Sequence, residues 1–107
     1  TETSTGILQP LDDIGQIARE NDALFLTDCV TSLGGQPVDL DRRGIDIAYS
    51  GTQKCLGGPP GLAPISFSDR AVEVIRGRKT KIQSFYFDMT LLEKYWGGES
   101  RWYQRTG

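Results

Sequence analysis

One lysine and one aspartate carry the chemistry that this sequence suggests. Lys54 lies in "GTQKCLGGPPG" (51–61), where glycines and a pair of adjacent prolines follow it. Adjacent prolines are not tolerated inside a helix, so the sequence predicts that Lys54 lies on or beside a loop of defined shape. A lysine amine that partial burial or a nearby cation keeps neutral can attack a carbonyl carbon and form a Schiff base. The commoner role of a loop lysine is a solvated surface charge.

Asp28 ends the apolar run "ALFLTD" (23–28), which is typical of a strand covered on both faces in a parallel sheet. The run "IDIAYS" (45–50) predicts a second buried strand, and the segment between them is long enough for a parallel crossover. Open α/β sheets bind ligands at the edge where the carboxyl ends of their strands meet. We therefore expect Asp28 and Lys54 to face one ligand. The alternative is an aspartate that only bonds the amides of its own loop.

A lysine and a carboxylate facing one ligand suit pyridoxal 5'-phosphate (PLP). The lysine forms an imine with the aldehyde of this cofactor, and the carboxylate pairs with its pyridinium nitrogen, which lets the ring accept electrons. The spacing of the two residues in the sequence does not by itself distinguish this cofactor from other ligands.

The remaining segments that must position these residues alternate between helix and strand. Helices are predicted at 9–22, 69–76 and 89–96, and further strands at 62–68 and 84–88. Pro10 suits the first position of the first helix, and Ser68 can cap the second. Pro64 favours an edge strand or a bulge. The alternation predicts an α/β fold.

Composition excludes several kinds of function. The 107 residues carry a net charge of −2 and an isoelectric point near 5.0, which gives no reason to expect a nucleic-acid or membrane partner. The chain has no histidine, so catalysis by a serine–histidine or cysteine–histidine pair is excluded within it. Cys29 and Cys55 lack metal-binding spacing, and no metal site is expected. We expect an intracellular location, either cytoplasmic or in an organelle such as the peroxisome or mitochondrion.

Several motifs occur in an order that resembles a known enzyme family. They are "ETSTG" near the start, "TDCVTSLGG" (27–35), "SGTQKCLGGPPG" (50–61), "ISFSDRA" (65–71) and "RKTK" (78–81). This order is similar to that of the alanine–glyoxylate and serine–pyruvate aminotransferases, class-V members of the fold-type I PLP enzymes. The resemblance implies that residues 1–107 are a fragment of the PLP-binding large domain, built on a mixed, mostly parallel sheet. The first part of that domain and the C-terminal small domain are expected to be absent.

The resemblance also implies which residues would contact the cofactor: Thr3, Asp28, Val30, Gln53, Lys54, Tyr103 and Thr106. Lys54 matches the Schiff-base lysine, which also acts as general acid and base, and Asp28 matches the partner of the pyridine nitrogen. Val30 matches the residue that packs on the ring face. Thr3 matches a hydroxyl contact near the ring oxygen, and Gln53 matches a contributor to the phosphate site.

Tyr103 and Thr106 match residues that reach the phosphate site of the neighbouring subunit, which implies a homodimer. The family usually has histidine at one or both positions between them, whereas this chain has Gln104 and Arg105. Arg105 could itself bind phosphate.

The implied activity is transamination from a small amino acid, alanine or serine, to a keto acid such as glyoxylate. The fragment alone is expected to be inactive, because the main phosphate cup and the arginine for the substrate carboxylate lie on other segments of the family's chain. Cysteine desulfuration on the same fold is an alternative, although those enzymes typically have histidine where Gln53 stands. A fragment without turnover that serves as an interaction module is another. A nucleotide binder is disfavoured, because "GTQKCLGG" does not fit the phosphate-loop pattern.

Overall fold

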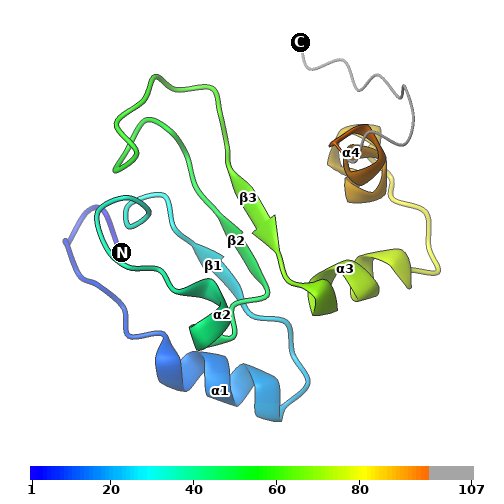
Figure 1. The fold of residues 1–107 in the computed structure, drawn as a ribbon, viewed down its shortest axis with the longest axis horizontal. Coiled ribbons are helices and arrows are strands. Elements are labelled where there is room, and N and C mark those ends of the chain that lie inside the picture. The colour runs from blue at the N-terminus through cyan, green and yellow to red at the C-terminus, as the bar shows by residue number, and fades with distance from the viewer. Residues whose placement is uncertain (97–107) are drawn as a thin grey trace. The chain divides into compact units, whose positions relative to one another are not determined.

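The computed structural model describes residues 1–96, which belong to two compact units divided after Ala71 (Figure 1). The elements of the first unit are α1 (Asp12–Glu20), β1 (Leu26–Asp28), α2 (Leu40–Arg43), β2 (Ile47–Tyr49) and β3 (Ile65–Phe67). Helix α3 (Asp69–Arg76) begins in this unit and continues into the second. The second unit also contains the 3-10 helix η1 (Phe85–Phe87) and helix α4 (Met89–Trp96). The predicted α/β class is confirmed.

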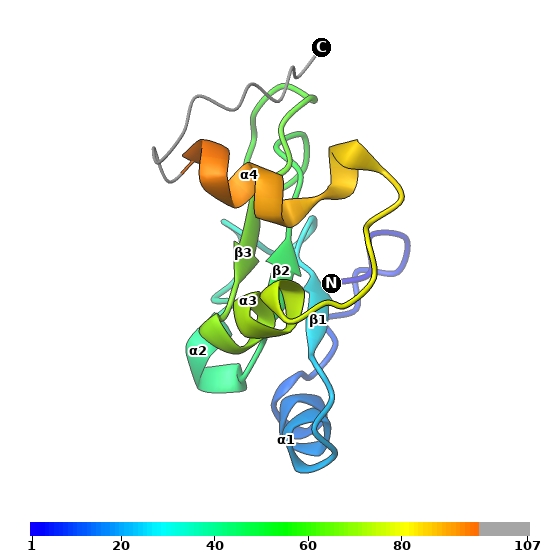
Figure 2. The ribbon, with the colours of Figure 1, turned by 90° about the vertical axis from the view of Figure 1, so that its right-hand side faces the viewer.

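The first unit is organised by a three-stranded sheet in the order β1-β2-β3, and Figures 1 and 2 both show β2 between its neighbours. Strands β1 and β2 are parallel, as predicted, with Thr27 opposite Ala48 and Asp28 opposite Tyr49. Strand β3 is antiparallel to β2 and begins directly after Pro64, so it is an edge strand of the described sheet, as the proline predicted. The loops that follow β1 and β2 therefore leave the sheet at the same end (Figure 1).

The hydrophobic core lies on one face of this sheet. It is formed by Phe25, Cys29, Ile45 and Ala48, and the side chains packed against it come from α1, α2 and the segments beside them. Burial alternates along β1, so that Thr27 is buried whereas Leu26 is 56% exposed. Among the described residues, the prediction that 23–28 is covered on both faces is therefore wrong. The alternation is the period of two that a strand shows when one of its faces is covered.

Helix α1 begins later than the sequence predicted. Its first hydrogen bond runs from the Gly15 amide to the Leu11 carbonyl oxygen, 2.9 Å, so Pro10 lies before the helix and not at its first position. Gly15 is the buried residue of this helix, because a Cβ atom there would lie 2.1 Å from the carbonyl oxygen of Arg43. Glycine thus lets α1 approach the end of α2 closely.

The second unit contains one clear error of prediction. Residues 84–88 were expected to form a strand, but Phe85–Phe87 form a 3-10 helix in which the Phe87 amide bonds the Ser84 carbonyl oxygen, 3.2 Å. Aromatic residues favour strands only where a neighbouring strand completes their hydrogen bonds, and no strand of the described residues pairs with this segment. The predicted helices are confirmed, and Ser68 Oγ accepts the Ala71 amide, 3.1 Å, at the start of α3.

Candidate active site

Asp28 lies at the carboxyl end of β1 and is exposed. Its Oδ1 accepts the Val30 amide, 2.8 Å, and its Oδ2 accepts the Tyr49 hydroxyl, 2.7 Å. The bond to an amide of its own loop, which the alternative interpretation predicted, is therefore present, and a second bond comes from the neighbouring strand. The bond to Asp28 raises the pKa of the Tyr49 phenol above its ordinary value, because it stabilises the protonated hydroxyl. Among residues 1–96, Asp28 has no ion-pair partner.

Lys54 lies in a turn on the loop that follows β2, and its side chain is exposed. The turn is closed by the Gly57 amide, which donates to the Lys54 carbonyl oxygen, 2.9 Å. Thr52 holds the base of the loop: its amide donates to the Leu62 carbonyl oxygen, 3.2 Å, and its own carbonyl oxygen accepts the Gly58 amide, 2.8 Å. Gly57 has a φ of +68°, a conformation that glycine adopts without steric cost. The predicted loop of defined shape is confirmed.

Thr31 joins the segments that carry the candidate residues. Its hydroxyl lies 2.6 Å from the hydroxyl of Thr3, and its carbonyl oxygen accepts a hydrogen bond from the thiol of Cys55, 2.9 Å. The N-terminal segment, the loop that follows Asp28 and the loop that carries Lys54 therefore meet at one end of the sheet (Figure 1). The parallel strands predicted that the loops after β1 and β2 leave the same end of the sheet, which is confirmed; that Asp28 and Lys54 face one ligand stays a prediction.

Two of the residues at this junction were not found from the sequence. Thr31 contacts each of the other two segments once, and Cys55 contacts Thr31 through its thiol. Neither the residue types nor their spacing in the sequence predicts these contacts. The pair "GG" at 34–35 was the available signal, because glycine permits close approach of a neighbouring chain. A Cβ on Gly35 would lie 3.3 Å from the Cys55 sulfur.

The structure says less about the other residues that the resemblance assigned to the cofactor site. Val30 is half-buried, and Gln53 is exposed with its Oε1 close to Gly51, 2.7 Å from where a Cβ would lie. Their contacts with a cofactor ring and phosphate stay predictions. Tyr103 and Thr106 lie outside the described residues.

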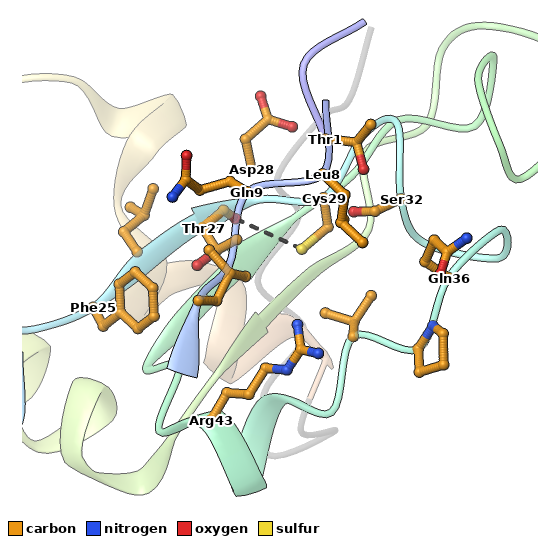
Figure 3. Close-up of a pocket in the computed structure, with 14 residues that line it drawn as sticks. Thr1, Leu8, Gln9, Phe25, Thr27, Asp28, Cys29, Ser32, Gln36 and Arg43 are labelled. Carbon is orange, nitrogen blue, oxygen red and sulfur yellow. Dashed lines mark hydrogen bonds between the residues drawn. The ribbon is translucent and has the colours of Figure 1, made fainter. Parts of the chain in front are cut away.

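A cavity of about 240 Å³ lies beside β1 and does not include Lys54 in its wall (Figure 3). Its wall includes Thr27 and Cys29 from the covered face of the sheet, and also Asp28. The Thr27 hydroxyl is buried and has no hydrogen-bond partner among residues 1–96. Burial raises the pKa of the Cys29 thiol, which keeps it protonated and unreactive. This cavity therefore shares the Asp28 carboxylate with the candidate site, but neither the Lys54 amine nor the loop that carries Lys54 contributes to its wall.

The described residues provide no obvious metal centre. No group of three or more cysteine, aspartate or glutamate side chains among residues 1–96 is arranged to hold a metal ion. In the same part of the chain, no helix combines the length and the apolar character needed to cross a bilayer.

Comparison with known sequences identifies the family. Residues 1–106 match the aminotransferase class-V family, so this chain belongs to that family. The chain is 52% identical over 100 residues to alanine–glyoxylate aminotransferase of Rattus norvegicus, covering 94% of this chain and 24% of that protein. It is 42% identical to (S)-ureidoglycine–glyoxylate transaminase of Bacillus subtilis, with 89% of this chain and 27% of that protein covered.

Solved structures agree with this assignment. The crystal structure of alanine–glyoxylate aminotransferase from Nostoc sp. superimposes with a TM-score of 0.91 at 52% identity, covering 99% of this chain and 28% of that chain. The structure of an aspartate aminotransferase from Thermus thermophilus gives a TM-score of 0.75 at 38% identity, covering 94% and 28% of the two chains. The expected fold, part of a fold-type I aminotransferase, is confirmed. The chain spans about a quarter of the length of the curated relatives it matches.

Proposed function

We propose that the full-length protein is a PLP-dependent aminotransferase that moves an amino group from a small amino acid, alanine or serine, to a keto acid such as glyoxylate. Family membership and the names of the relatives support the reaction and the acceptor. The observation that carries the proposal is the contact between the loop after Asp28 and the loop of Lys54, made by Thr31 and Cys55 at 2.9 Å. It brings the two loops together at the ligand-binding edge of a parallel strand pair.

The donor set fits PLP. Asp28 is an exposed carboxylate that accepts hydrogen bonds from neutral donors among residues 1–96, and each of its oxygens can accept a second bond. It can therefore receive the N–H of a pyridinium ring. Lys54 offers an exposed primary amine, and the surrounding loop has room because a Cβ on Gly57 or Gly61 would meet nothing within 4 Å.

Different residues of this chain would then bind the cofactor and transfer the proton. When bound, PLP supplies an electron sink that stabilises negative charge at the substrate α-carbon. Lys54 would hold the cofactor covalently and, once displaced by substrate, would accept and return a proton at its Nζ. Asp28 would keep the proton on the ring nitrogen through its charge. Val30 would pack against the ring, and Thr3 would bind near the ring oxygen.

We further propose that the chain is a piece of the PLP-binding large domain and is inactive alone. In the full-length protein, Tyr103 and Thr106 would complete the phosphate site of a partner subunit in a homodimer. The relatives' names give alanine or (S)-ureidoglycine as the amino donor, and for this protein we propose alanine or serine.

Trapping the Schiff base tests the function. We expect borohydride reduction of the full-length protein with PLP to label Lys54, as mapped by mass spectrometry. Lys54→Ala should lower the turnover number by at least about 10³-fold, because a covalent anchor and a general base are lost together. Lys79→Ala, which removes another exposed lysine, is the matched control and should keep normal turnover. Label on a different lysine, or normal turnover by Lys54→Ala, would contradict the proposal.

A further inference from the structure

We propose that Tyr49 is a positioning residue for Asp28, and that its hydroxyl fixes the carboxylate in the orientation that receives the cofactor's ring nitrogen. The inference rests on the proposed function, since it concerns the residue assigned to that nitrogen. Nothing in the sequence motifs that point to the cofactor assigns a role to Tyr49.

The register of the sheet brings the two side chains together. Asp28 and Tyr49 are direct partners in the parallel pairing of β1 with β2, so both side chains project from the same face. This is the face opposite the core, on which Tyr49 remains 38% exposed. The contact is therefore a product of strand pairing and does not require burial to hold it.

Two donors act on different oxygens of the carboxylate. The Tyr49 hydroxyl donates to Oδ2 at 2.7 Å, and the Val30 amide donates to Oδ1 at 2.8 Å. The terminal torsion of an aspartate is broad when nothing restrains it. A donor on each oxygen fixes the plane of the carboxylate, whereas the Val30 amide alone would allow it to swing about one bonded atom.

The tyrosine remains a donor under working conditions. Its pKa is raised, chiefly by the hydrogen bond to Asp28, so the phenol stays protonated at neutral and mildly alkaline pH. Hydrogen bonds from a neutral hydroxyl to an ionised carboxylate are stronger than those between neutral groups. Tyr49 thus holds Asp28 and leaves its negative charge in place. A lysine or arginine at position 49 would instead neutralise that charge.

A double-mutant cycle on PLP binding by the full-length protein tests this role. The variants are Tyr49→Phe, Asp28→Asn and the double variant, and Tyr95→Phe, which removes another partly exposed hydroxyl, is the matched control. The readout is the fraction of Lys54 fixed by borohydride across a PLP concentration series that extends to weak binding. The thermal stability of each apoprotein is measured in parallel.

We expect Tyr49→Phe to weaken PLP binding about tenfold, which corresponds to one hydrogen bond to a charged group. Asp28→Asn should weaken binding more, and adding Tyr49→Phe to the Asp28→Asn variant should cost nothing further. The apoprotein should lose little thermal stability, because the bond lies on an exposed face. Tyr95→Phe should bind PLP as the parent does.

Two results would overturn the role of Tyr49 alone: unchanged PLP binding by Tyr49→Phe, or an equal loss whether Asp28 is intact or replaced by asparagine. A different result would overturn the proposed function as well. If Asp28→Asn binds PLP as tightly as the parent, Asp28 is not the partner of the ring nitrogen, and Tyr49 has nothing to position.

Discussion

Two aspartates at opposite ends of the same strand pair have opposite surroundings. Asp28 ends β1, is exposed, and among residues 1–96 it accepts hydrogen bonds from neutral donors only. Asp46 directly precedes β2 and is only 7% exposed. Its Oδ2 accepts the Phe25 amide and a guanidinium N–H of Arg70, both at 3.0 Å, and its Oδ1 accepts the Ser68 hydroxyl at 2.8 Å.

The difference separates a structural carboxylate from one that is available to a ligand. A buried charge is tolerated when a counter-charge and hydrogen bonds satisfy it, and Asp46 has both. It ties the start of β1, the start of β2 and the first turn of α3 together, and Arg70 extends the network to Asp22 at 2.8 Å. Asp28 has no counter-charge among residues 1–96, so its charge can pair with a cationic ligand.

The largest effect on stability is expected at Asp46, the structural carboxylate. Asp46→Ala in the full-length protein should lower the free energy of unfolding by about 3 kcal/mol, because it leaves Arg70 and the Phe25 amide without their buried acceptor. Urea denaturation measures the loss. Asp41→Ala, at an exposed aspartate, is the control and should stay within about 0.5 kcal/mol of the parent.

Measuring PLP binding beside stability distinguishes the roles of the two carboxylates. PLP binding by the folded fraction should survive Asp46→Ala, whereas Asp28→Asn should weaken PLP binding with little loss of stability. An Asp46→Ala protein that is as stable as the parent would show that Asp46 is not a structural carboxylate and does not differ from Asp28 in this respect.

Acid should act on stability through Asp46. Burial alone would raise the pKa of its carboxyl, but the bonds from Phe25 and Ser68 and the charge of Arg70 outweigh burial and lower it. A lowered folded-state pKa means that the stabilisation is present above the unfolded value of about 4 and is lost as pH falls through the folded value. The free energy of unfolding should therefore fall less steeply below about pH 4 in Asp46→Asn than in the parent. Parallel curves for the two proteins would contradict this.

The sequence predicted what depends on local pattern. The parallel strands were predicted from apolar runs of strand length, and the loop of Lys54 from its glycines and prolines. The start of α3 was predicted from a serine that precedes a pattern of helical periodicity. Each of these signals lies within a few residues of the element that it determines. For the same reason, the end of the sheet that carries Asp28 and Lys54 could be predicted.

Contacts set by three-dimensional pairing could not be predicted in this way. Asp46 lies within "IDIAYS", where the sequence shows only a polar residue in an apolar run, and its partner Arg70 is far along the chain. Tyr49 meets Asp28 only because of the register of β1 and β2. The thiol of Cys55 reaches Thr31 through the shape of a loop, which no periodicity encodes.

The smallest effect is expected at Ser68, whose hydroxyl serves two partners. It accepts the Ala71 amide at 3.1 Å as the cap of α3 and donates to Asp46 Oδ1 at 2.8 Å. Ser68→Ala should lower the free energy of unfolding by about 1 kcal/mol, a typical cost for a lost cap. Ser66→Ala, at an exposed serine of β3, is the control and should change it little.

Ser68→Asp separates the two partners of this hydroxyl. Aspartate is as good a cap as serine, but its ionised carboxylate cannot donate to Asp46 and would repel it. If the cap alone matters, Ser68→Asp should be as stable as the parent. We expect it to be less stable than Ser68→Ala at neutral pH, with the gap narrowing in acid as the carboxylates are protonated. The opposite order would mean that Asp46 is held by Arg70 and Phe25 without help from Ser68, and that the buried network is smaller than its contacts indicate.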